Sequence, residues 1–273
     1  MNADIVARLQ DSFDVDINSL NTVLKAIEEL VSKNIHSARK LEVADRLNFL
    51  KNIFSQFDKD LSSSVIALKI EEEYVEHVDL WFKAKLEPSF SQLRKVAQLF
   101  NCDIDWLFHG LSKPFTVVED IFPVNPTEAI AWFNKSHQLY GEPLKIFLIG
   151  QQDTPDDLYI VKIYEFNRFE TFLIKNISLD YKIDGQKFKN LQDFANCLKL
   201  ISKNHELASL KKKIKSFVLK RENFEQLLSG QSHPLCVLTT YTPWWEDIWD
   251  ESFYHKNQYW NGWIELCNKI HQK

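Results

Sequence analysis

Hydrophobic residues recur every three or four positions through most of the first 110 residues, and this spacing predicts α-helices. The first such stretch covers residues 17–35, with Asn, Lys, Glu and Ser on its opposite face. Its apolar stripe consists of Ile17, Leu20, Val23 or Leu24, Ile27, Leu30 and Val31. A stripe of this kind needs a partner surface. Two interpretations stay open: the helix packs on its own domain, or it is an arm that dimerises with a second copy.

Residues 39–110 continue the helical pattern almost without interruption. The helical segments are 41–57, 60–70, 73–85, 90–100 and a short apolar stub that ends at Gly110. Five helices in about seventy residues predict a compact all-α bundle. The stretch 111–126, "LSKPFTVVEDIFPVNP", contains three prolines and predicts an extended linker.

The remainder of the chain mixes two periodicities, which predicts an α+β domain over residues 127–273. "PLKIFLIG", "LYIVKIYEF" and "FETFLIKN" are expected to be strands, the last two joined as a hairpin across Asn167-Arg168. "NLQDFANCLKLISK" and the whole of residues 206–230 are expected to be helices, the second ending at Gly230. "PLCVLTTY" (234–241) is expected to be a further strand. The fold class is therefore mixed, an all-α N-terminal part followed by an α+β part.

The segment "EPSFSQLRKVAQLFNCDIDWLFHG" carries the most specific pattern in the chain. A proline-serine pair precedes a helix with Leu93, Ala97 and Phe100, then a polar break and a stub that ends on Gly110. Residues 46–110 resemble the lambda-repressor-like (XRE) helix-turn-helix family on these positions. The resemblance implies a five-helix bundle, with 60–70 and the helix after Tyr74 as the helix-turn-helix pair. The domain organisation is then an arm (1–40), this domain (41–110), a linker (111–126) and a regulatory or dimerisation domain (127–273).

The resemblance also implies a set of DNA-contacting residues and a partner. Hydroxyl groups at the start of the first helix would donate to phosphates, His77 would face the major groove, and two lysines would contact the backbone. The candidate DNA-binding residues are Ser62, Ser63, Ser64, Tyr74, His77, Lys83 and Lys85. We expect a sequence-specific transcriptional regulator that binds double-stranded DNA as a homodimer.

Three departures from the family pattern support an alternative. The turn, which is usually small or contains glycine, is Glu71-Glu72-Glu73 here, and Ala84 occupies the position after the recognition helix where glycine is common. The outer face of that helix offers Glu76, His77 and Asp79, without the Arg, Asn or Gln that read guanine and adenine best. The alternative is an interaction protein of a defence, toxin-antitoxin or phage assembly whose helix-turn-helix unit no longer reads DNA.

The distribution of charge is also unusual for a DNA-binding protein. The net charge is −5, and residues 1–113 carry 14 Lys and Arg against 18 Asp and Glu, so the candidate DNA-binding half is the more acidic one. The densest basic run is 209–221, where Lys211, Lys212, Lys215 and Lys220 would share one face of a helix. A solvated face and a contact with DNA or an acidic partner both stay open.

The cysteines, the N-terminal residues and the absence of catalytic motifs argue against several classes of protein. Four widely spaced cysteines predict neither disulfides nor a zinc site, and the acidic N-terminus and the lack of long apolar runs predict a cytoplasmic protein without membrane contact. No phosphate-binding, metalloprotease or serine-hydrolase motif occurs, so we expect no enzyme activity, cofactor or metal. Trp244, Trp245, Trp249, Trp260 and Trp263 form core, a subunit interface or a pocket for a small-molecule effector.

Overall fold

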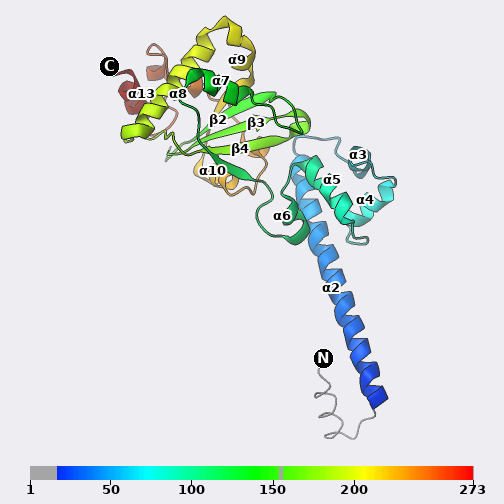
Figure 1. Ribbon diagram of the computed structural model, residues 1–273. Coiled ribbons are helices and arrows are strands. Elements are labelled where there is room, and N and C mark those ends of the chain that lie inside the picture. The colour runs from blue at the N-terminus through cyan, green and yellow to red at the C-terminus, as the bar shows by residue number, and fades with distance from the viewer. Residues whose placement is uncertain (1–16, 154–155, 273) are drawn as a thin grey trace. The chain divides into compact units, whose positions relative to one another are not determined.

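The computed structural model describes residues 17–153 and 156–272, apart from the side chains of residues 17–20 and 30–37. The described chain separates into two compact units. The first unit comprises the chain up to Phe49 together with Ser62–Gln92, and the second comprises Leu50–Leu61 together with Leu93–Lys273. Two helices, α2 (Ile17–Phe54) and α5 (Phe90–Phe100), begin in the first unit and end in the second (Figure 1).

Helix α2 is a single element of 38 residues that passes through residue 40 without a break. At a rise of about 1.5 Å per residue, it is roughly 57 Å long. Side chains over residues 21–29 are almost all exposed, including Val23 at 54% and Ile27 at 48%. The described part of the apolar stripe is therefore not packed on its own domain. Residues 1–16 of the predicted arm lie outside the described residues.

The first unit also contains the short helices α3 (Ser63–Lys69) and α4 (Val75–Phe82). Their apolar positions point inward, because Ile66, Ala67, Val78 and Trp81 are all buried. The C-terminal end of α4 is tied to α2, where Asn48 Nδ2 donates to the carbonyl oxygen of Phe82 at 2.9 Å.

The second unit contains the end of α2, α5 from Leu93 onward and the stub helix α6 (Ile104–His109). Asp103 caps α6, because its side chain accepts a hydrogen bond from the backbone N–H of Trp106 at 2.8 Å. Gly110 ends the helix in the left-handed conformation with φ 69°, which glycine adopts without a Cβ penalty. The predicted glycine stop is confirmed.

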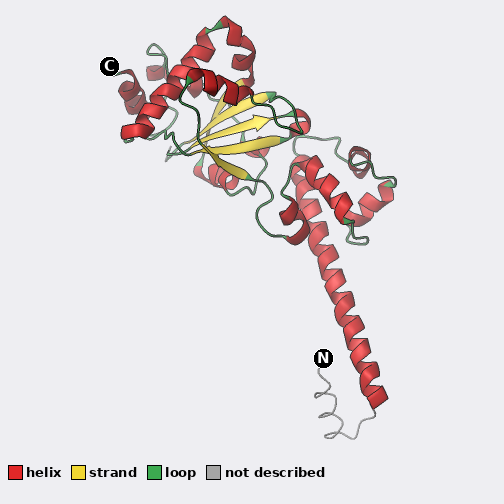
Figure 2. Ribbon diagram, in the orientation of Figure 1, coloured by secondary structure: helices red, strands yellow, loops and turns green. Residues whose placement is uncertain are grey.

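A five-stranded mixed sheet with the order β1-β4-β3-β2-β5 forms the centre of the second unit (Figure 2). The strands are β1 (Val117–Asp120), β2 (Lys145–Gln151), β3 (Leu158–Ile163), β4 (Phe169–Ile174) and β5 (Ile214–Leu219). The predicted hairpin is confirmed, since β3 and β4 pair antiparallel across the turn η1 (Glu165–Asn167). The stretch 111–126, predicted as an extended linker, supplies β1, which pairs parallel with β4.

Helices cover both faces of this sheet. On one face lie α7 (Pro126–Asn134) and α8 (Gly185–Lys203), and on the other lies α10 (Arg221–Leu228) (Figure 1). Successive side chains of β3 point to opposite faces of the sheet, so each face needs a cover. Ile160 belongs to the core under α8. The ring of Tyr159 contacts Phe224 of α10, with centroids 4.9 Å apart. The fold of the described residues is thus mixed α/β, as expected at the level of class.

Two element predictions in this half are wrong. Residues 206–230 are not one helix: they form η2 (His205–Leu207), α9 (Ala208–Lys213), β5 and α10. The apolar spacing fits a helix, but "IKSFVL" is rich in strand-forming residues and pairs parallel with β2. As a result, Lys215 and Lys220 do not share a helical face with Lys211 and Lys212.

Residues 234–241 are not a strand either. They begin with the short helix α11 (Pro234–Val237), because proline is favoured at the first helical position and the side chain of His233 caps Leu235 N–H. Tyr241, at the end of this segment, forms an isolated antiparallel β-bridge with Phe217.

The C-terminal aromatic run completes the core with α12 (Trp244–Asp247), η3 (Tyr254–Lys256) and α13 (Trp263–His271). All five tryptophans of this run are buried and belong to the hydrophobic cluster under α8. Trp260 makes edge contacts with Trp244 and Trp263, with ring centroids 5.5 and 4.7 Å apart. Core packing is therefore the role that the structure assigns to these rings.

Candidate functional site

The segment that the sequence predicted as a helix-turn-helix pair forms two short helices in the first unit, α3 and α4, joined by a turn. Ser62 caps α3, since its hydroxyl accepts from Val65 N–H at 3.3 Å. Glu71 in the turn and Ala84 after α4 both have φ 55°, in the left-handed region that favours glycine. The resemblance implied a small residue or glycine at both places, and the left-handed backbone at each is the conformation that glycine adopts with the least strain.

The candidate DNA-binding residues have different environments. Ser62 and Ser64 are exposed at the start of α3, and Ser63 is half-buried. Tyr74 is the residue that precedes α4 and is 54% exposed. Lys83 and Lys85 are exposed after the end of α4.

His77 is already engaged within the first unit. Its Nδ1 lies 2.9 Å from Oε1 of Glu72, and Gln92 Nε2 donates to the other oxygen of that carboxylate at 2.6 Å. Burial opposes ionisation of Glu72, but the hydrogen bonds from His77 and Gln92 outweigh it and lower the pKa of this carboxyl group. The ring of Tyr74 packs on His77, with centroids 5.1 Å apart. Glu72 therefore ties the turn to α4 and to the start of α5.

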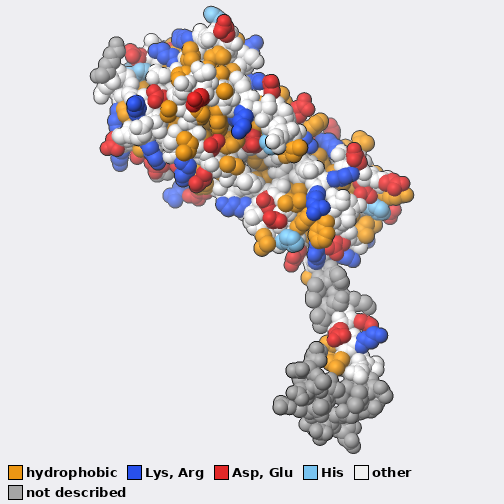
Figure 3. All heavy atoms as spheres, viewed as in Figure 1, with side chains coloured by type: hydrophobic (Ala, Val, Ile, Leu, Met, Phe, Trp, Pro, Cys, Tyr) orange, Lys and Arg blue, Asp and Glu red, His pale blue; other side chains and the backbone are white. Residues whose placement is uncertain are grey.

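The outer side of the turn and of α4 combines carboxylates with apolar side chains, and we call it the α4 face. It consists of Glu71, Glu73, Tyr74, Val75 and Glu76, all exposed. Tyr74 and Val75 contribute the apolar area, at 54% and 42% exposure. Figure 3 shows acidic and hydrophobic side chains next to one another on the surface of this unit. Such a face repels phosphates at close range and offers apolar area to a protein.

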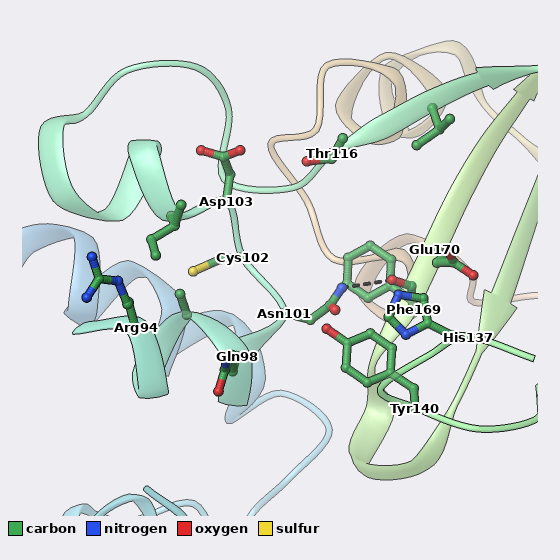
Figure 4. A pocket seen from close by; sticks show the side chains of 13 residues that line it. Arg94, Gln98, Asn101, Cys102, Asp103, Thr116, His137, Tyr140, Phe169 and Glu170 are labelled. Atoms are coloured by element: carbon green, nitrogen blue, oxygen red, sulfur yellow. Dashed lines mark hydrogen bonds between the residues drawn. The ribbon is translucent and has the colours of Figure 1, made fainter. Parts of the chain in front are cut away.

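The second unit contains a cavity of about 410 Å³, which we call the larger cavity. It lies between α5, the start of β1, β4 and the loop that follows α7. In Figure 4, His137, Tyr140 and Glu170 lie on one side of the cavity, Arg94 and Cys102 lie on the other, and Asn101 lies between them. Its polar lining residues are Arg94, Gln98, Asn101, Cys102, Asp103, Thr116, His137, Tyr140 and Glu170.

Local contacts fix the shape of this larger cavity. Asn101, which has φ 51°, donates through Nδ2 to the carbonyl oxygen of Phe169 at 2.8 Å. The rings of His137 and Tyr140 stack with centroids 4.0 Å apart, and the Arg168 guanidinium lies 4.9 Å from the centroid of Tyr140. Burial raises the pKa of Cys102 out of the normal thiol range, so this thiol is protonated at neutral pH and a poor nucleophile.

A smaller cavity of about 310 Å³ adjoins it and shares His137 and Glu170 in its lining. Lys162 of β3 contributes its side chain to this cavity although only 2% of the residue is exposed. Burial lowers the pKa of Lys162 to about 8, and the charge of Glu170 opposes that shift.

Sequence reasoning missed both cavities, because their lining residues come from five separate segments. One local signal was visible: Lys162 interrupts the otherwise apolar run "LYIVKI" in a strand that is buried on both faces. A lysine at such a position has to be paired or to serve a site.

In comparisons with known proteins, no family model, curated protein or solved structure matches this chain. Among the described residues, no helix is long and apolar enough to cross a membrane, and no cluster of His, Cys, Asp or Glu has the arrangement of a metal site.

Proposed function

We propose that the protein is an interaction protein whose helix-turn-helix unit binds a protein partner through the α4 face. The observation that carries this proposal is the exposure of Tyr74 and Val75 between Glu71, Glu73 and Glu76. Aromatic side chains in a polar surround are common anchors of protein interfaces. The partner that fits this face has an apolar patch edged by Lys or Arg.

The scaffold of the α4 face is, in this proposal, a lambda-repressor-like five-helix bundle built from the C-terminal part of α2 and from α3–α6. Local geometry supports it: Ser62 and Asp103 cap their helices, and Gly110 and Ala84 take left-handed conformations. The same scaffold supports sequence-specific DNA binding as the competing function, in which Ser62, Ser64, Lys83 and Lys85 contact phosphates.

The distribution of charge supports protein binding over DNA binding. DNA affinity comes largely from Lys and Arg that replace counterions along the phosphates. Between Glu71 and Lys85 the chain has five acidic residues and two lysines. Glu72 is held inside the unit by His77 and Gln92, but the exposed glutamates Glu71, Glu73 and Glu76 would face the duplex.

The partner experiment places a photo-crosslinking amino acid at Val75 in cells, with the same residue at Glu29 of α2 as the control position. A protein captured from position 75 alone is then purified and titrated with the full chain. Tyr74→Ala should weaken that binding on the order of 30-fold, the effect of losing an aromatic anchor worth about 2 kcal/mol. Ser64→Ala, which changes an exposed residue of α3, should leave it unchanged.

DNA binding is tested separately by titrating the full chain with duplex fragments at low and moderate salt. We expect no salt-dependent complex. A complex at low salt that is lost in Lys83→Glu and Lys85→Glu variants would overturn the protein-binding proposal in favour of the regulator.

We further propose that the N-terminal half of α2 joins two copies of the chain. Ile17, Leu20, Leu24, Ile27 and Val31 alternate at spacings of three and four, the seam pattern of a coiled coil. Ile27 is exposed in the single chain, as expected for a helix without its partner. A second copy fits because the seam residues are all aliphatic, while Lys25, Glu28 and Glu29 lie outside the seam.

Light scattering of the full chain tests this association. Ile27→Lys should convert a dimer to a monomer, whereas Glu29→Lys places the same side chain on the opposite side of α2 and should leave the dimer intact. A monomer at every accessible concentration of the unmodified chain contradicts the proposal.

A further inference from the structure

The environment of Lys162 is unusual for a lysine. Its Nζ donates to the carbonyl oxygen of Trp132 at the end of α7 and lies 4.1 Å from the centroid of the Trp132 ring. The centroid of the Phe172 ring on β4 lies 5.5 Å from the same Nζ. The ammonium group is therefore held in an aromatic enclosure at the wall of the smaller cavity.

Charged groups reach this amine from three neighbouring elements. Glu170 of β4 is the cross-strand partner of Lys162, and its carboxylate also accepts a hydrogen bond from the Tyr164 hydroxyl. Asp120 of β1 accepts from Trp132 Nε1 at 3.0 Å. Glu170 and Asp120 favour the ammonium form, whereas Lys135, beyond the end of α7, disfavours it. Burial outweighs the two carboxylates, which places the pKa of Lys162 at about 8.

The smaller cavity can hold a small ligand beside this amine. Its volume of about 310 Å³ is roughly ten times the ~30 Å³ that one water molecule occupies in the liquid. Four consecutive polar residues, Lys135, Ser136, His137 and Gln138, line it together with Lys162. Asp120 and Glu170 also line it, and their carboxylates accept hydrogen bonds from Trp132 and Tyr164. The two lysines and the side-chain donors of residues 136–138 suit a carboxylate group on the ligand.

We propose that Lys162 is a reactive amine that captures a small carbonyl compound bearing a carboxylate, such as an oxo acid, as an imine. The ammonium first gives up a proton to solvent, and the lone pair on Nζ attacks the carbonyl carbon. A C–N bond forms while the C=O π bond breaks, and the oxygen takes a proton back from solvent. Loss of this oxygen as water, with one further proton from nitrogen, leaves a protonated imine.

No oxidant or reductant is required for this step, because one ammonium and one carbonyl give one iminium and one water. Lysines used for imine chemistry are typically desolvated, so that an appreciable fraction is neutral near pH 7. With a pKa of about 8, roughly a tenth of Lys162 is neutral at pH 7. An unperturbed lysine is neutral at roughly three parts in ten thousand under the same conditions.

The experiment uses glyoxylate as the probe on the full-length chain, followed by borohydride reduction, which converts the imine to a stable carboxymethyl amine. Peptide mass mapping then gives the modified fraction of each lysine. Lys162 should be modified on the order of tenfold faster than the exposed Lys145 at pH 7, below the ratio of neutral fractions because access to the cavity is limited. The midpoint of its pH profile should lie near 8, well below that of Lys145.

Two variants make the test specific. Glu170→Gln removes a charge that raises the pKa of Lys162, so the midpoint for Lys162 should move to lower pH. Glu165→Gln, which changes an exposed residue of the neighbouring turn, should leave it in place. Modification spread over exposed lysines with Lys162 intact, or a Lys162 midpoint above pH 10, would overturn the proposal, because a purely structural lysine predicts one of these results.

Discussion

The buried imidazole of His233 makes the stability of the second unit dependent on pH. This residue is fully buried against the rings of Phe54, Phe57 and Phe169. Its Nδ1 accepts from Leu235 N–H at 3.1 Å, so the proton of the neutral ring resides on Nε2, which donates to the carbonyl oxygen of Asn167 at 3.0 Å. Protonation of Nδ1 would remove the hydrogen bond from Leu235 N–H and place two N–H groups facing each other. Burial lowers the pKa of His233 to about 3, and the Asn167 carbonyl only partly opposes this.

The sign and size of the effect follow from this pKa. In the unfolded chain a histidine titrates near 6.5, so below that pH the unfolded state takes up a proton that the folded state rejects. The contribution of His233 to stability is therefore complete above pH 6.5 and decreases as the pH falls towards 3. Between pH 7 and pH 5 the loss is about 2 kcal/mol, at about 1.4 kcal/mol per pH unit below 6.5.

Urea unfolding followed by tryptophan fluorescence at pH 7 and pH 5 measures this loss. Other groups also titrate in this range, so the informative quantity is the difference between the unmodified chain and His233→Asn. The variant is less stable at pH 7, because it lacks the packed ring, but its stability should fall between the two pH values by about 2 kcal/mol less. His205→Asn, at an exposed histidine, should behave like the unmodified chain. An equal pH dependence in all three chains would refute the assignment of a depressed pKa to His233.

Three backbone predictions follow from positive φ angles. Gly230→Ala should destabilise the second unit by several kcal/mol, because a Cβ there would lie 2.1 Å from the carbonyl oxygen of Phe115. Gly141→Ala should cost about 1 kcal/mol, because a Cβ at that position meets no atom within 4 Å. Chemical denaturation of both variants measures the difference. Ala84→Gly should stabilise the first unit by about 1 kcal/mol, since Ala84 has φ 55°. Glu71→Gly should act in the same direction for the same reason, and a lower unfolding midpoint in both variants would contradict this account.

The elements that the sequence predicted correctly are those whose signals are local. The stub that ends at Gly110 needed only a capping aspartate and a glycine, and both act within one helical turn. The β3–β4 hairpin needed two strand-like runs and the short polar pair Asn167-Arg168 between them. Because these contacts join residues close together in the chain, the local amino-acid sequence is sufficient to predict the elements.

The failures have a common cause in long-range pairing. Residues 214–219 have helical apolar spacing, but their neighbour in space is β2, about seventy residues earlier in the chain, and the parallel ladder outweighs local preference. Lys162, Trp132 and Glu170 likewise meet only after β3, β4 and α7 have assembled. When a site is built from such separate segments, its lining residues are not close together in the sequence. Here the one local signal is Lys162, a charged residue in an apolar strand.

The acidic turn before α4 separates into two kinds of carboxylate, and this division bears on the choice between DNA and protein partners. Glu72 accepts hydrogen bonds inside the first unit, so it is part of the fold whatever the unit binds. The contact of His77 Nδ1 with Glu72 leaves that ring less able to bind a base edge, and His77 is the candidate residue expected to face the major groove. Glu71 and Glu73 project from the same turn and are exposed. DNA binding at this surface would require both glutamates to be replaced and His77 to be released from Glu72, whereas a protein partner with basic residues would fit the surface as it is.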